Sequence, residues 1–227
     1  GILRVPFIPF WDPGTNLMAF GDISYLPYVA LVYPFWLGGI DIREVLAWIA
    51  IGAGLFIFVL GTITWFYGGV QKRKTVDFWI YRYSRHPQYL GFIIWSYGVM
   101  LFAAQQPVPM GGSNPGASLP WLLTSLIIVC IALAEENRMR KEDSERYLQY
   151  TAGAPFMFPI PRFVSTAITF PMRLVLKKDW PETGKELVAT FAVYAALLIL
   201  LSLPFVLLGW PQGIGWSGWP GYMPGTF

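Results

Sequence analysis

The sequence contains very few of the residues on which metal proteins and disulfide-stabilised proteins depend. Its 227 residues include one cysteine, Cys130, and one histidine, His86. These counts exclude a disulfide between two cysteines of this chain and a zinc site made from its histidine and cysteine residues alone. Charged residues are also scarce, at 13% of the chain against roughly one quarter in ordinary proteins. So little charge argues against both a soluble enzyme and a disordered chain.

Apolar and aromatic residues are abundant instead. Hydrophobic residues account for 55% of the chain, and aromatic residues for 18%, including 11 tryptophans. Tryptophan and tyrosine are enriched at the two lipid–water boundaries, where the ring contacts lipid and its polar atom contacts water. The composition therefore indicates a membrane protein.

Segments without any charged residue predict where the chain crosses the membrane. Val45–Val70 has 26 such residues and Leu187–Gly209 has 23, and both exceed the roughly 20 apolar residues that a spanning helix needs. Two shorter segments, Tyr89–Gln105 with 17 residues and Leu119–Ala134 with 16, are expected to form a helical hairpin. The loop Gln106–Ser118, rich in Gly, Pro and Ser, would join its two helices.

A further span is expected at Ile23–Ile40, where Pro27 and Pro34 would kink the helix without breaking the span. The sequence thus predicts an all-α integral membrane protein with about five transmembrane helices. The segment Pro155–Trp180 mixes aromatic and apolar residues with basic ones, and we expect it to lie in the membrane interface. Cys130, inside the fourth span, is interpreted as a small packing residue.

The basic residues predict the orientation of the spans. Of the 16 lysines and arginines, 14 fall in two segments, one before the third span and one after the fourth. Because basic residues flanking spans stay inside, both segments are predicted to face the cytoplasm. The net charge of +3 is explained by topology and by contacts with lipid headgroups, so no nucleic-acid partner is expected.

Polar residues gather at the two cytoplasmic ends of the predicted hairpin. Arg85, His86 and Pro87 directly precede its first helix, and Glu135 and Glu136 directly follow its second helix. A hairpin begins and ends on the same side of the membrane, so we expect the two groups to lie close together. The alternative interpretation is structural: basic residues that flank a span, and glutamates that pair with arginines on an exposed helix face.

The spacing of residues after the hairpin favours a buried position for one glutamate. Glu136, Met139, Asp143, Tyr147 and Tyr150 follow one another by three or four residues, which puts them on one partly apolar helix face. Two adjacent carboxylates at a membrane boundary are costly unless a cation meets them, and a cationic ligand would be such a partner.

The two groups resemble the signature of a known family. Residues 81–91, Tyr-Arg-Tyr-Ser-Arg-His-Pro-Gln-Tyr-Leu-Gly, are similar to the first motif of the isoprenylcysteine carboxyl methyltransferase and phospholipid methyltransferase superfamily. Glu135-Glu136, followed by Tyr147, Tyr150 and a Pro-rich exit through Arg162, is similar to its second motif. The resemblance covers Tyr81–Arg162. It divides the chain into N-terminal membrane helices (1–80), a methyltransferase-like core (81–162) and a C-terminal part (163–227).

The resemblance implies an enzyme with a cytoplasmic-face pocket for S-adenosylmethionine. His86 and Tyr89 would hold the methionyl and ribose part, Arg85 would shape the loop or meet the carboxylate, and Glu135 or Glu136 would bind the amino group or ribose hydroxyls. The acceptor would be hydrophobic and embedded in the membrane, either a prenylcysteine carboxylate or a lipid headgroup. A carboxylate acceptor needs a nearby cation, for which Arg138, Arg140 and Arg162 are candidates by position.

Departures from the family pattern leave other functions open. Trp79-Ile80 stands where the family has Gly-Pro, Asp143-Ser144 stands where it has Phe-Gly, and Phe163–Phe227 adds a span and an uncharged tail. The chain could therefore be a structural or assembly subunit that contacts other membrane subunits through its C-terminal helix. A third hypothesis is a lipid reductase using NADPH, since sterol reductases share a similar scaffold and a related Arg-His motif. No Gly-rich dinucleotide motif supports that hypothesis.

Overall fold

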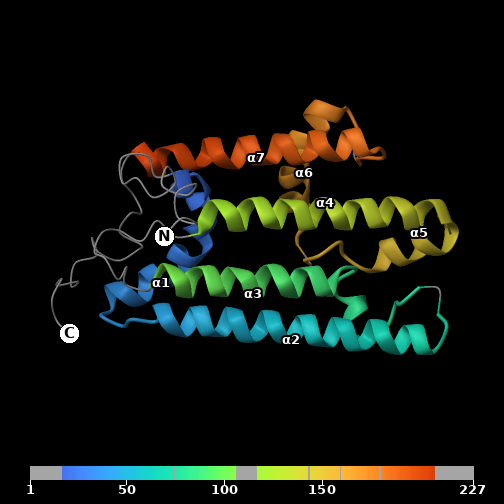
Figure 1. The fold of residues 1–227 in the computed structure, drawn as a ribbon, viewed down its shortest axis with the longest axis horizontal. Helices are drawn as coiled ribbons and strands as arrows, with labels where there is room; N and C mark the ends of the chain where they lie inside the picture. The colour runs from blue at the N-terminus through green and yellow to red at the C-terminus, as the bar shows by residue number, and fades with distance from the viewer. Residues whose placement is uncertain are drawn as a thin grey trace, which may run out of the picture. The chain divides into compact units, whose positions relative to one another are not determined.

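The computed structural model describes residues 17–73, 75–105, 117–142, 144–158, 160–178 and 180–207, and most of them are in helices. Figure 1 shows the order of the elements along the chain. They are η2 (Leu17–Tyr25), α1 (Leu26–Leu37), α2 (Arg43–Val70), η3 (Trp79–Arg82), α3 (Pro87–Ala104), α4 (Ser118–Glu142), α5 (Ser144–Gly153), α6 (Arg162–Leu176) and α7 (Gly184–Leu207). Over these residues there is no strand, so the predicted all-α class is confirmed.

Within the described part of the chain, four helices are long and apolar enough to cross a membrane: α2, α3, α7 and the part of α4 from Ser118 to Lys141. They correspond to four of the predicted spans. At 18 residues, α3 is close to the minimum for a span, because each residue advances a helix by about 1.5 Å. The loop expected between the third and fourth spans lies largely outside the described residues.

The segment expected as a first span is divided into two shorter helices. The 3₁₀-helix η2 ends at Tyr25, and α1 has only 12 residues, which is about 18 Å of helix. Pro27 lies in the first turn of α1, where its missing N–H costs nothing, and Pro34 lies inside the helix. Gly38 and Gly39 end it. These breaks leave α1 shorter than the roughly 30 Å of the hydrocarbon core.

Helix α6 matches the expected interfacial segment. Most of its large apolar side chains are exposed, including Phe163, Phe170 and Leu174 at 76%, 62% and 69%. Arg173 lies in its last turn. A helix of 15 residues with exposed apolar and basic side chains is typical of a segment that lies along a membrane surface.

The described residues form two compact units, and one of them contains residues 17–49, 97–105, 117–124 and 195–207. Its core joins Tyr28 and Val32 of α1 to Ala47 of α2 and to Met100 and Leu101 of α3. The Asp22 carboxylate accepts a 2.6 Å hydrogen bond from the Ser118 hydroxyl, and both side chains are buried. This contact connects η2 with the first residue of α4.

The second unit contains residues 50–96 and 125–194 and includes every residue of the predicted site. Within it, α2 and α3 approach through glycines. A Cβ atom on Gly54 would lie 2.6 Å from Trp95 Cα, and one on Gly91 would lie 2.8 Å from Phe58 Cα. Only glycine allows backbones this close, so these two positions fix where α3 begins relative to α2.

Candidate functional site

The start of α3 positions the first predicted motif. The backbone N–H of His86 donates to the Ser84 hydroxyl at 3.3 Å, and the His86 carbonyl accepts from Leu90 N–H at 2.9 Å, as expected for a residue that caps a helix. Pro87 occupies the first helical position, where proline is favoured. The N–H of Arg85 donates to the Pro155 carbonyl at 3.0 Å. The motif is therefore tied to the segment that follows α5.

Arg85, His86 and Glu136 meet in a buried cluster. Arg85 Nε lies 2.9 Å from Glu136 Oε1, and His86 Nε2 lies 3.1 Å from the same oxygen. The exposed fractions of the three side chains are 9%, 4% and 0%. A carboxylate only accepts hydrogen bonds, so His86 Nε2 carries the hydrogen in this contact. The hairpin thus brings the two predicted groups together, with Glu136 as the innermost member.

Glu135 lies at the exposed edge of the same cluster. Its Oε1 accepts a 2.6 Å hydrogen bond from the Tyr89 hydroxyl, and its Oε2 lies 3.8 Å from His86 Nδ1. Its side chain is 49% exposed. The two adjacent glutamates therefore differ in environment: Glu136 is fully buried between Arg85 and His86, whereas Glu135 is reachable from solvent.

Aromatic rings cover His86 on two sides. The Tyr89 ring stacks on it at 5.8 Å between centroids, and the Phe156 ring meets it edge to face at 5.2 Å. The guanidinium of Arg85 lies 5.8 Å from the Phe156 centroid. Sequence reasoning assigned Phe156 only to the interfacial segment and missed this role. The available signal was the position of Phe156 beside the Pro-rich exit of the second motif, which placed it near the predicted site.

Helix α5 adds two tyrosines from the second motif. The Tyr150 hydroxyl donates to the Tyr81 carbonyl at 2.9 Å, which holds η3. Tyr147 is 2% exposed, and burial together with the nearby charge of Glu136 raises its pKa well above the usual range. Its hydroxyl therefore keeps its proton. A hydrogen bond with the Glu136 carboxylate contributes to this rise in pKa, although neither the Tyr147 hydroxyl nor Glu136 Oε2 has a partner at good hydrogen-bonding geometry among the described residues.

The three arginines predicted to be catalytic lie in different surroundings. Arg140 is half-buried, its guanidinium lies 4.2 Å from the Trp180 ring centroid, and its Nε has no hydrogen-bond partner among the described residues. Arg138 is exposed and lines a cleft together with Leu187 of α7. Because it is two residues after Glu136, it points about 200° away from that glutamate around α4. Arg162 begins α6, and its side chain lies outside the described residues. Their roles stay predictions.

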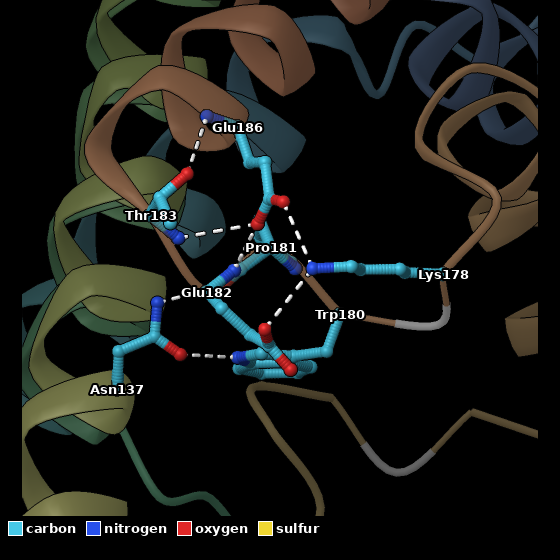
Figure 2. A network of polar contacts seen from close by, with 7 residues as sticks. All are labelled: Asn137, Lys178, Trp180, Pro181, Glu182, Thr183 and Glu186. Carbon is cyan, nitrogen blue, oxygen red and sulfur yellow. Dashed lines mark hydrogen bonds and ion pairs between the residues drawn. The ribbon is translucent and has the colours of Figure 1, made fainter.

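The connection between α6 and α7 is fixed to α4 by a second polar network, shown in Figure 2. Asn137 donates through Nδ2 to the Pro181 carbonyl and accepts at Oδ1 from Trp180 Nε1, both at 2.6 Å. Asn137 follows the two glutamates directly, but sequence reasoning did not single it out. The available signal was an asparagine at the predicted end of the span, because its amide can both donate and accept hydrogen bonds and so can fix a neighbouring segment.

The described residues contain no group of three or more His, Cys, Asp or Glu side chains that could hold a metal ion. What the cluster offers instead is a pair of carboxylates, an imidazole and an arginine under aromatic cover.

A family model described as "Protein of unknown function (DUF1295)" matches residues 45–154. The matched range contains Arg85, His86 and Tyr89 as well as Glu135 and Glu136, and it ends just before Pro155. No curated protein and no solved structure matches the chain.

Proposed function

We propose that the protein is a membrane methyltransferase that uses S-adenosylmethionine to methylate a hydrophobic acceptor, either a prenylcysteine carboxylate or a lipid headgroup. The observation that carries the proposal is the contact between the two motifs: Arg85 and His86 meet Glu136, and Tyr89 meets Glu135. The motif resemblance of Tyr81–Arg162 supports it. By the distribution of basic residues, we assign this site to the cytoplasmic face.

The chemistry of the cluster fits the methyl donor. S-adenosylmethionine carries an ammonium, a sulfonium, a carboxylate and ribose hydroxyls. Glu135 is exposed enough to accept from an ammonium or a hydroxyl, and Glu136 Oε2 is a buried acceptor without a partner among the described residues. Arg140 Nε is a buried donor that also lacks a hydrogen-bond partner among the described residues, and it could donate to a carboxylate. Buried polar atoms without a partner at good geometry favour a bound ligand that supplies one.

The residues around the site would then have distinct roles. When bound, S-adenosylmethionine would supply an electrophilic methyl group, whose bond to sulfur would break as the acceptor bonds to its carbon, releasing the neutral thioether S-adenosylhomocysteine. The Tyr89 hydroxyl fixes the orientation of the Glu135 carboxylate, which holds the donor. The rings of Tyr89 and Phe156 exclude water from His86. For a carboxylate acceptor, Arg140 is the arginine best placed to balance charge, with Arg138 and Arg162 as alternatives.

Calorimetric titration of the purified protein with S-adenosylmethionine tests the proposal. Glu135→Gln and Tyr89→Phe are expected to weaken binding at least tenfold with little change in thermal unfolding, because both side chains lie at the accessible edge. Glu145→Gln, at an exposed glutamate on α5, is the matched control and is expected to bind normally. His86→Ala and Glu136→Ala are expected to weaken binding too, but they also disrupt a buried ion pair. No binding to folded wild-type protein would contradict the proposal.

One observation favours a structural subunit as the second candidate. Glu136 is fully buried and already paired with Arg85 and His86, which is also what a fixed structural connection between two helices would look like. In that case the protein would copurify stoichiometrically with other membrane subunits and would not bind the donor. Titration with NADPH tests the reductase hypothesis, which requires that the protein bind NADPH and not S-adenosylmethionine.

A further inference from the structure

A cleft lies on the face of α4 that points away from Glu136. It has a volume of about 460 Å³ and is lined by Ala134, Asn137, Arg138 and Lys141 of α4, by Leu187 of α7 and by Glu182, which precedes α7. Ala134 and Leu187 supply apolar surface, whereas Arg138 and Lys141 supply two positive charges. The proposed methyl transfer uses no part of this cleft except Arg138, and that only as an alternative.

The cleft continues an exposed stripe along α4. Ile127, Ile131, Ala134, Arg138 and Lys141 follow one another by four, three, four and three residues, so they share one helix face. All five are exposed, with Ile127 at 48% and Ile131 at 45%. The stripe is apolar along the part of α4 that is long enough to span a membrane and becomes cationic at its end. An amphiphile with an apolar chain and an anionic head matches this order.

The acidic residue of the lining, Glu182, is paired with a lysine. Lys178 Nζ lies 3.0 Å from Glu182 Oε2 and 3.0 Å from Glu186 Oε1, as Figure 2 shows. The Glu182 carboxylate is therefore already met by a cation and opposes an incoming anion less than a single carboxylate would. Asn137 fixes the neighbouring Trp180-Pro181 segment to α4, so the cleft is bounded on both sides by elements with defined contacts.

We propose that this cleft binds the phosphate headgroup of an anionic phospholipid, with its acyl chains along Ile127 and Ile131. Arginine and lysine together suit a phosphate, since the guanidinium donates two parallel hydrogen bonds and the ammonium adds a compact charge. Basic pockets between spanning helices bind anionic headgroups in this way. A free phosphate would find the same cations but would gain nothing from the apolar stripe. Arg138 is the one residue that this cleft shares with the candidates for the proposed methyl transfer.

Native mass spectrometry of the detergent-purified full chain, titrated with dioleoyl phosphatidylglycerol, tests the site. Arg138→Gln/Lys141→Gln is expected to weaken binding at least tenfold. Lys72→Gln/Lys177→Gln removes the same charge at two exposed positions outside the cleft and is expected to leave binding within twofold of wild type. Ala134→Phe keeps every charge but fills the apolar floor, and it is expected to weaken binding at least fivefold. Thermal unfolding of each variant establishes that it is folded.

Three outcomes would overturn the proposal. Equal losses in the two double variants would mean that only overall surface charge matters. Unchanged binding in a folded Ala134→Phe variant would mean that the cleft is not the site. Displacement of the lipid by glycerol 3-phosphate at equal concentration would mean that the ligand is a soluble phosphate. Dioleoyl phosphatidylcholine, which has the same chains and a zwitterionic head, is expected to bind at least tenfold more weakly than phosphatidylglycerol.

Discussion

Arg85 and Glu136 form an ion pair in which the guanidinium Nε lies 2.9 Å from the carboxylate Oε1, with 9% and 0% of their side chains exposed. His86 approaches the same oxygen. The pair connects the residue two positions before α3 to the later part of α4. Because the α4 partner is completely enclosed, neither charge can be removed without a large change in the energy of the other.

Arg85→Met is expected to lower the free energy of unfolding by about 3–5 kcal/mol, because it leaves the Glu136 carboxylate buried beside His86 alone. Adding Glu136→Gln removes the uncompensated charge and should recover at least about 1 kcal/mol of that loss. Denaturant unfolding of the purified protein in detergent measures both values. Arg82→Met, at an exposed arginine at the end of η3, is the control and should change stability by less than about 0.5 kcal/mol. Equal effects at Arg82 and Arg85 would refute a buried ion pair.

Stability is expected to fall between about pH 4 and pH 7 through Asp22. Burial raises its pKa from 3.8 to about 7, and the hydrogen bond from Ser118 offsets part of that rise. In this range the folded state keeps a proton on Asp22 that the unfolded state has released. The contribution of Asp22 to stability is therefore complete below pH 3.8 and is lost as the pH rises through 7. The stability of Asp22→Asn relative to the wild type should therefore increase as the pH rises, by on the order of 2–4 kcal/mol in total.

Melting curves of wild type and Asp22→Asn at several pH values measure this difference. Asp41→Asn is the matched control, because hydrogen bonds from the Arg43 side chain lower the pKa of Asp41, and its titration falls below the range in question. Its difference from wild type should stay constant between pH 5 and pH 8. A constant difference for Asp22→Asn as well would contradict the buried, proton-holding state of Asp22.

Gly91→Ala is expected to destabilise the protein by about 1–3 kcal/mol, because the added methyl group would lie 2.7 Å from the Gly54 carbonyl oxygen and 2.8 Å from Phe58 Cα. Backbone atoms cannot move aside as a flexible side chain can. Gly52→Ala, on the same helix as Gly54, meets nothing within 4 Å and should be neutral or slightly stabilising. The melting temperatures of the two variants give the comparison. A neutral Gly91→Ala would show that α2 and α3 are not in close contact there.

Sequence reasoning succeeded where the pattern is local or where a short connection forces two segments together. The charge-free segments predicted the four long helices, because a span requires continuous apolar sequence. The hairpin predicted that His86 and Glu136 would be close. The shortness of α1 was harder to predict, since Pro27 and Pro34 are compatible with either a kinked span or a short helix.

The sequence by itself determined the membrane class, the positions of the long helices and the two motifs, because each follows from residue type along a continuous stretch. The residue spacing already favoured Glu136 as the buried glutamate, and the tertiary structure decided which partners each glutamate meets: Arg85 and His86 for Glu136, and Tyr89 for Glu135. Glu135 and Glu136 are chemically identical, and they differ because neighbouring positions point about 100° apart on α4. Tertiary packing likewise brought Phe156 to His86 and Trp180 to Arg140, contacts between residues far apart in the chain that no local pattern encodes.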